Sequence, residues 1–101
     1  MNSIIPQTLN EMNEQLLAQV EEMASLMLAK EDIAIILDIP RDDFLHRLLD
    51  QDGDTYKRFQ TGRMKTIAQV RKSIFELASN GSSPAQTEAM KLIRDAQMMD
   101  I

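Results

Sequence analysis

Helix-breaking residues are scarce in this chain. Its 101 residues include only three glycines and three prolines, and aromatic residues make up only 4% of them. Glycine and proline are the residues that most disfavour a helix interior, and strands favour β-branched and aromatic residues. The sequence therefore predicts an all-α fold of about five helices. The length is that of one domain, so we expect a single helical domain over residues 1–101.

The first helix is expected over residues 8–28. Thr8 stands in position to cap it, and Glu11 follows three residues later, which is the spacing of a capping box. Apolar residues then recur at helical intervals close to those of a heptad. They are Leu9, Met12, Leu16, Val20, Met23 and Met27. This stripe is either one face of the domain core or a contact between subunits.

Residues 30–50 resemble a helix-turn-helix. Helices are expected at 30–37 and 41–49, separated by the break at Ile39-Pro40, with Asp38 where glycine is frequent. Asp tolerates the left-handed conformation, so this departure from the pattern is mild. Ile39 would plug the turn. The residues expected to face inward are Ile33, Ala34, Leu37, Phe44, Leu45, Leu48 and Leu49, with Arg41, Asp42, Asp43, His46, Arg47 and Asp50 outside.

The second helix of this pair suits DNA only in part. Its N-terminal residues would meet base edges, and Arg41 suits guanine. Asp42 and Asp43 carry the wrong sign for phosphate. The pair therefore either reads DNA or serves as a scaffold with an acidic, solvated face.

Residues 54–98 are expected to form a helical hairpin. Asp54 would cap a helix over 55–79, which Asn80-Gly81 would end. Gly62, inside this helix, marks a bend or a close contact. Ser83 would cap the last helix, with Pro84 at its first position and Gln86 completing a capping box. The expected apolar faces are Tyr56, Phe59, Ile67, Val70, Ile74, Leu77 and Ala78 on one helix and Ala89, Met90, Ile93, Ala96 and Gln97 on the other.

Charge is divided unevenly along the chain. The net charge is −5, but residues 1–54 carry three basic and twelve acidic residues, and residues 55–101 carry eight basic and four acidic ones. Such a split is typical of separate functions or of head-to-tail association.

A basic helical stripe is enough for phosphate contact. The candidate DNA-binding residues are Lys57, Arg58, Arg63, Lys65, Arg71, Lys72, Arg41 and Arg47. Alternatively, the basic residues of the second half solvate a helix face or pair with the acidic half of a neighbouring subunit.

Catalytic and metal-binding patterns are missing from the sequence. Cysteine is absent, which excludes disulfides and thiolate chemistry, and His46 is the only histidine. Asp50, Asp52 and Asp54 alternate as in a calcium loop, but Thr55 and Thr61 occupy the positions of its required glycine and glutamate, so a capped acidic turn is the better interpretation. We expect no enzyme activity, cofactor or metal. No signal peptide or membrane-spanning run is recognisable, so a cytoplasmic location is expected.

The stretch after the helix-turn-helix resembles a known family. It contains Tyr-x5-Gly-Arg from Tyr56, then Ile-Ala-x-Val from Ile67, then Leu-Ala-x-x-Gly ending at Gly81, and a short Ala-rich helix. This frame is similar to that of the DNA-packaging small terminase subunits of tailed phages and prophages, over roughly residues 28–97. The resemblance implies a non-enzymatic DNA-recognition subunit that assembles as a homo-oligomer and regulates a separate large ATPase and nuclease subunit. It would act in the host cytoplasm.

A second function remains open on the residues alone. The acidic helix at 41–49 and the Met-rich stripe of the first helix would also suit a small protein–protein adaptor or a virion-associated structural protein that does not bind DNA.

Overall fold

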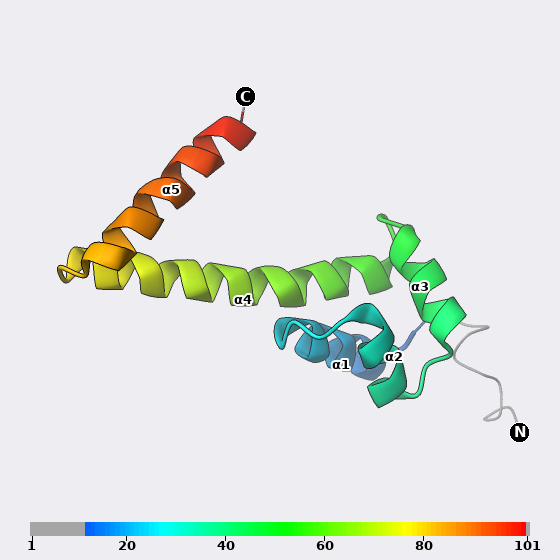
Figure 1. Ribbon diagram of the computed structural model, residues 1–101. Helices are drawn as coiled ribbons and strands as arrows, with labels where there is room; N and C mark the ends of the chain where they lie inside the picture. Colours follow the sequence, from blue (N-terminus) through cyan, green and yellow to red (C-terminus); the bar gives the residue numbers. More distant parts are fainter. Residues whose placement is uncertain (1–11, 101) are drawn as a thin grey trace, which may run out of the picture. The chain divides into compact units, whose positions relative to one another are not determined.

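The computed structural model describes residues 12–100 and confirms an all-α fold (Figure 1). The helices are α1 (Glu14–Ser25), α2 (Lys30–Leu37), α3 (Arg41–Leu49), α4 (Asp54–Ser79) and α5 (Ser83–Met99), and no strand occurs among the described residues. The structure divides into an N-terminal unit, residues 1–66, and a C-terminal unit, residues 67–101, with part of α4 in each. One domain over residues 1–101 stays a prediction.

The core of the N-terminal unit joins four helices. Its buried apolar side chains are Met12, Leu17, Val20, Ala24, Ile33, Ala34, Ile39, Phe44, Leu48 and Phe59. Leu17, Val20 and Ala24 of α1 thus belong to the core of the N-terminal unit, and a contact of the stripe with another subunit stays a prediction. The predicted stripe is wrong in part, because Leu17 and Ala24 are buried while Met27 is exposed and Leu16 and Met23 are half-buried.

Helix α1 is shorter than the predicted span of residues 8–28. The Asn13 side chain caps it by accepting a hydrogen bond from the Leu16 backbone N–H at 2.8 Å. The capping box predicted at Thr8 and Glu11 lies outside the described residues. The helix ends at Ser25, and Met27 then adopts a left-handed conformation with φ of 62°.

The connection between α2 and α3 has the predicted local structure. Asp38 is left-handed with φ of 56°, and the buried Ile39 donates its backbone N–H to the Ala34 carbonyl at 2.9 Å. This pattern satisfies the last carbonyls of α2 and turns the chain into α3. Phe44 and Leu48 face inward as expected, but Leu49 is wrong, because it is exposed, and Leu45 is only half-buried. That the pair is a helix-turn-helix stays a prediction.

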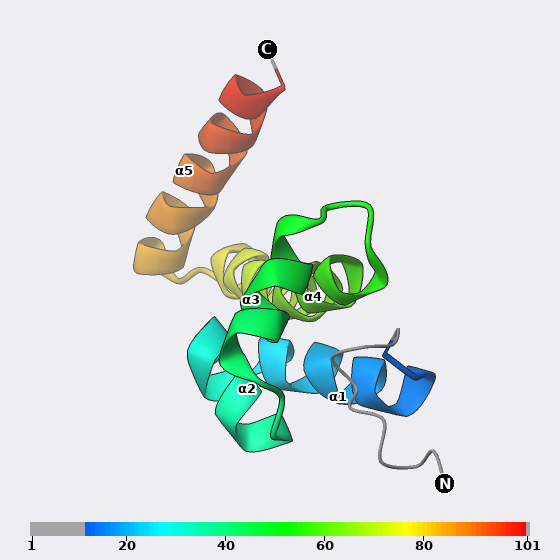
Figure 2. The ribbon, with the colours of Figure 1, turned by 90° about the vertical axis from the view of Figure 1, so that its right-hand side faces the viewer.

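Helices α1 and α4 approach each other closely at Gly62. A Cβ atom built on Gly62 would lie 2.1 Å from the Glu21 carbonyl oxygen and 2.9 Å from the Ala24 Cβ. Gly62 is therefore a close contact, and α4 continues through it as one helix from Asp54 to Ser79. Within the N-terminal unit, α1 lies beside α4 and runs in the same direction (Figures 1 and 2).

The turn between α4 and α5 follows the predicted helix-stop pattern. Gly81 has φ of 101°, and the Ser82 backbone N–H donates to the Leu77 carbonyl at 3.0 Å. The predicted cap of α5 is wrong by one residue, because the Ser82 side chain, not that of Ser83, accepts from Ala85 N–H. The Gln86 side chain donates to the Ala78 carbonyl at 3.1 Å and so links the two helices of the hairpin.

The C-terminal unit buries little of its apolar surface. Only Ala85 and Ala89 are buried among its described residues, and both are small. The predicted inner face of α5 is wrong beyond Ala89, because Met90, Ile93, Ala96 and Gln97 are exposed. On α4, Ile67, Ile74 and Ala78 are half-buried while Val70 and Leu77 are exposed.

Candidate nucleic-acid interface

The eight basic residues predicted to contact DNA lie on two helices. Helix α3 carries Arg41 and Arg47, and α4 carries the other six. The α4 residues fall into both units: Lys57, Arg58, Arg63 and Lys65 belong to the N-terminal unit, and Arg71 and Lys72 belong to the C-terminal unit.

Two of the basic residues on α4 are held by glutamates of α1. The Arg58 Nη1 lies 2.8 Å from Glu14 Oε2, and its Nε lies 2.8 Å from Glu21 Oε1. Lys65 Nζ lies 2.6 Å from the other oxygen of Glu21. Arg58 and Lys65 thus pair with acidic residues of α1 in the same chain, and the pairing of α4 bases with a neighbouring subunit stays a prediction.

This contact shifts the ionisation of its members. Hydrogen bonds from Lys65 and then Arg58 hold the pKa of Glu21 below its ordinary value of 4.5. Hydrogen bonds to Glu14 and then Glu21 raise the pKa of Arg58. Both shifts favour the charged forms, so the contact stays ionic at neutral pH.

Arg63 also links α4 to the segment that follows α1. Its guanidinium stacks over the Phe59 ring, 4.4 Å from the centroid, and its Nη2 donates to the Leu28 carbonyl at 3.0 Å. The Arg63 Nε is buried and has no hydrogen-bond partner in the described part of the chain. Its guanidinium thus joins Phe59 to the segment that follows α1, and its stacking on the ring offsets part of the cost of the unpaired Nε.

The two arginines of α3 lie in different surroundings. Arg41 is exposed, with Nη1 3.1 Å from Asp42 and Nη2 3.7 Å from Glu31. Arg47 was expected to face outward, but this is wrong, because its side chain is largely covered and pairs with Asp43 at 2.9 Å. The i,i+4 spacing explains that pair. Asp43 is therefore neutralised locally, whereas Asp42 stays on the surface beside Arg41.

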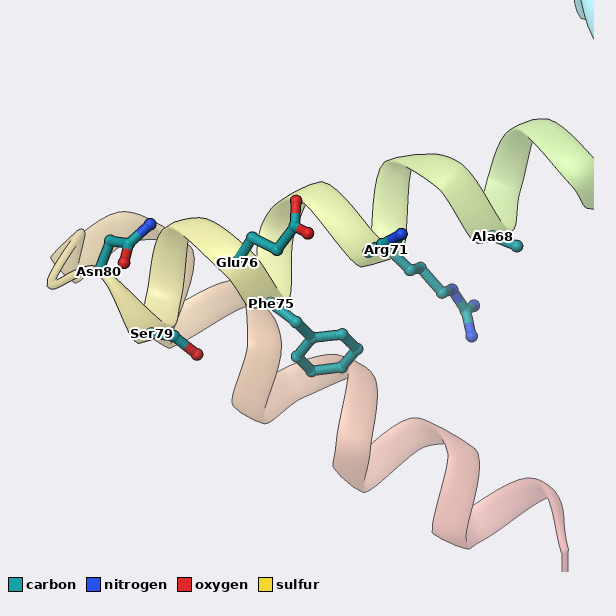
Figure 3. Close-up of a pocket in the computed structure, with 7 residues that line it drawn as sticks. Ala68, Arg71, Phe75, Glu76, Ser79 and Asn80 are labelled. Carbon is teal, nitrogen blue, oxygen red and sulfur yellow. The ribbon is translucent and has the colours of Figure 1, made fainter.

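In the C-terminal unit, Arg71 and Lys72 line an open hollow on α4 together with Ala68, Phe75, Glu76, Ser79 and Asn80. Figure 3 shows the Phe75 ring lying in the angle between α4 and α5, with Arg71 projecting on the same side of α4. Neither basic residue makes an ion pair within residues 12–100. With Lys57, these are the α4 bases that are exposed and make no ion pair within residues 12–100.

A second hollow lies between α3 and the start of α4, lined in part by His46, Asp50 and Thr55. Polar groups around this hollow already make local hydrogen bonds. The buried Thr55 hydroxyl donates to Asp54 Oδ1 at 3.2 Å, and Asp50 Oδ1 accepts from the Asp52 backbone N–H. The Asp50–Asp54 stretch is thus an acidic turn as expected, but the cap predicted at Asp54 is wrong by one residue, because Asp54 is the first residue of α4. The described residues contain no group of His, Cys, Asp and Glu side chains arranged to hold a metal ion.

No model of a known protein family, no curated protein and no solved structure matches this chain. None of the helices in the described part is both long enough and apolar enough to cross a membrane.

Sequence reasoning missed the glutamates that hold Arg58 and Lys65. A spacing signal for them exists, because Glu14 and Glu21 are seven residues apart on α1, as Arg58 and Lys65 are on α4. Seven residues make nearly two helical turns, so each pair shares a helix face. Recognising their contact requires knowing that α1 and α4 pack side by side.

Proposed function

We propose that this chain is a non-enzymatic DNA-binding adaptor that resembles a small terminase subunit, works as an oligomer, and acts in the cytoplasm of a host cell. The observation that carries the proposal is the α2–α3 pair. Its left-handed Asp38 and its buried Ile39, Phe44 and Leu48 meet the local demands of a helix-turn-helix, and the terminase-like frame from Tyr56 to Gly81 follows it. A large ATPase and nuclease subunit is the further partner implied by the resemblance.

Exposed bases support the DNA part of the proposal. Lys57, Arg71 and Lys72 on α4 and Arg41 on α3 lie on the surface. Phosphate contacts from such residues are independent of base sequence and release condensed counterions, so binding weakens steeply with salt.

Duplex DNA of mixed sequence tests the proposal by electrophoretic shift or fluorescence anisotropy. We expect binding at ~50 mM salt that weakens steeply towards ~200 mM. The Lys57→Glu, Arg71→Glu, Lys72→Glu variant is expected to lose this binding. The matched control is Gln69→Glu, which adds negative charge on the same helix without removing a base. Absence of a shift with the unaltered chain at ~50 mM salt contradicts the proposal.

A second function, a protein–protein adaptor or virion-associated structural protein that does not bind DNA, is favoured by two observations. The exposed first turn of α3 carries Asp42, and Arg58 and Lys65 are already paired with α1. For this function the chain would form a defined oligomer whose mass by light scattering does not change when DNA is added.

A further inference from the structure

The contact between α1 and α4 is a matched ladder of opposite charges. Glu14 and Glu21 lie on one face of α1, and Arg58 and Lys65 lie on one face of α4. Because the two helices run in the same direction in the N-terminal unit (Figure 1), Glu14 meets Arg58, and Glu21 reaches both bases. Phosphate would approach the same donors, so the carboxylates and a nucleic acid compete for Arg58 and Lys65.

The two carboxylates accept four hydrogen bonds from Arg58 and Lys65. Arg58 Nη1 donates to both oxygens of Glu14, at 2.9 and 2.8 Å, and its Nε donates to Glu21. The Glu21 side chain is only 19% exposed, and its two oxygens accept from different bases. Lys65, by contrast, is 67% exposed, so it stays accessible to solvent while it is paired.

Helix α1 is fixed against α4 by the core on either side of Glu21. Val20 and Ala24, on either side of Glu21, are fully buried, and the Glu21 carbonyl lies against Gly62. The Thr66 hydroxyl also donates to the Ser25 carbonyl. The packing of α1 therefore holds the backbone of Glu21 beside Arg58 and Lys65.

We infer that α1 is a built-in competitor of nucleic-acid phosphate on α4: Glu14 and Glu21 withhold Arg58 and Lys65 from DNA. This inference rests on the proposed function. It leaves Lys57, Arg71 and Lys72 as the α4 bases that contact DNA in the unaltered chain, and it makes DNA binding weaker than the number of basic residues suggests.

The test measures how DNA affinity depends on salt for the unaltered chain and for the Glu14→Gln, Glu21→Gln variant. Glutamine keeps the side-chain length and removes the charge. Each additional phosphate contact contributes about 0.9 to the slope of log K against log salt, so two released bases steepen it by about 1.8. We also expect binding to tighten by about tenfold or more at ~0.1 M salt.

Two controls separate release of these bases from loss of negative charge in general. Glu22→Gln with Glu88→Gln removes the same charge from exposed glutamates that make no ion pair within residues 12–100, and it should leave the slope unchanged. Arg58→Gln with Lys65→Gln, added to the Glu14→Gln, Glu21→Gln variant, should cancel the gain in affinity and slope.

The outcomes distinguish the inference from the proposed function. If the unaltered chain binds DNA and Glu14→Gln, Glu21→Gln leaves its slope and affinity unchanged, or if the control pair steepens the slope equally, the inference is overturned and the proposed function stands. If no variant binds at ~50 mM salt, both are overturned. Should the double variant fail to fold by circular dichroism, Glu14→Gln alone decides, since that carboxylate is 77% exposed: tighter binding supports the inference and unchanged binding overturns it.

Discussion

At the scale of single residues, Gly62 sets the distance between α1 and α4. A methyl group there would lie 2.1 Å from the Glu21 carbonyl oxygen, a backbone atom that can move only if α1 moves. Alanine is favoured over glycine by about 1 kcal/mol inside a helix, but overpacking of this kind costs about 1–3 kcal/mol or more. The steric cost therefore exceeds the gain in helix propensity, and alanine at this position destabilises the fold.

We predict that Gly62→Ala lowers the free energy of unfolding by about 2 kcal/mol in denaturant titrations followed by circular dichroism. Ser73→Ala is the matched control, because Ser73 is exposed on the same helix, and this change should be neutral or slightly stabilising. A Gly62→Ala protein as stable as the unaltered chain would show that α1 and α4 are less closely packed than described here.

At the scale of helices, the ladder between α1 and α4 makes stability depend on pH. The pKa of Glu21 is lowered in the folded state by Lys65 and Arg58, so folding favours its ionised form. The stabilisation is fully present above the ordinary pKa of 4.5 and is lost as the pH falls through the lower, folded value. Acid therefore weakens the contact between the two helices.

We predict that the free energy of unfolding decreases from neutral pH to below 4.5, and that Glu21→Gln removes part of this decrease. Glu22→Gln, the neighbouring exposed glutamate, should retain the full pH dependence. Denaturant titrations at a series of pH values measure all three proteins. Equal pH profiles for the unaltered chain and Glu21→Gln would contradict the assignment.

Helix ends were predictable where a residue's own backbone preference decides them. Asp38 and Gly81 end α2 and α4 as the sequence indicates, because both tolerate the left-handed conformation. The end of α1 was not predictable in this way, since Met27 adopts a left-handed conformation that its side chain disfavours. Packing of Leu28 and its carbonyl against the N-terminal unit, where Arg63 binds that carbonyl, supplies the reason.

At the scale of the whole molecule, the net charge of each part of the chain depends on where the boundary between the two parts is drawn. Cutting the sequence after residue 54 separates an acidic half from a basic half. The structural boundary after residue 66 returns four bases to the acidic unit, which leaves that unit with a net charge of −5 and residues 67–101 with four bases and four acids. The candidate site was therefore predictable as a set of basic residues, but their availability was not, because it depends on contacts between residues about 40 positions apart.

The C-terminal unit carries an apolar seam that its own helices leave partly uncovered. Ile67, Val70, Ile74 and Leu77 follow the 3-4-3 spacing of a heptad, and Val70 and Leu77 are 54% and 55% exposed. With only two buried alanines, a hairpin of this size has little core of its own. A second copy can cover the seam, and because this unit has equal numbers of acids and bases, two copies would meet without net repulsion.

We therefore predict that the chain is an oligomer in solution and that Val70→Asp with Leu77→Asp lowers its mass, measured by light scattering, towards that of the 11.5 kDa monomer. The helical content of the N-terminal unit should persist, because neither residue belongs to its core. Ala68→Asp adds a charge to the opposite, exposed face of the same helix and should leave the mass unchanged. A monomeric unaltered chain, or an oligomer indifferent to both aspartates, would contradict self-assembly through this seam.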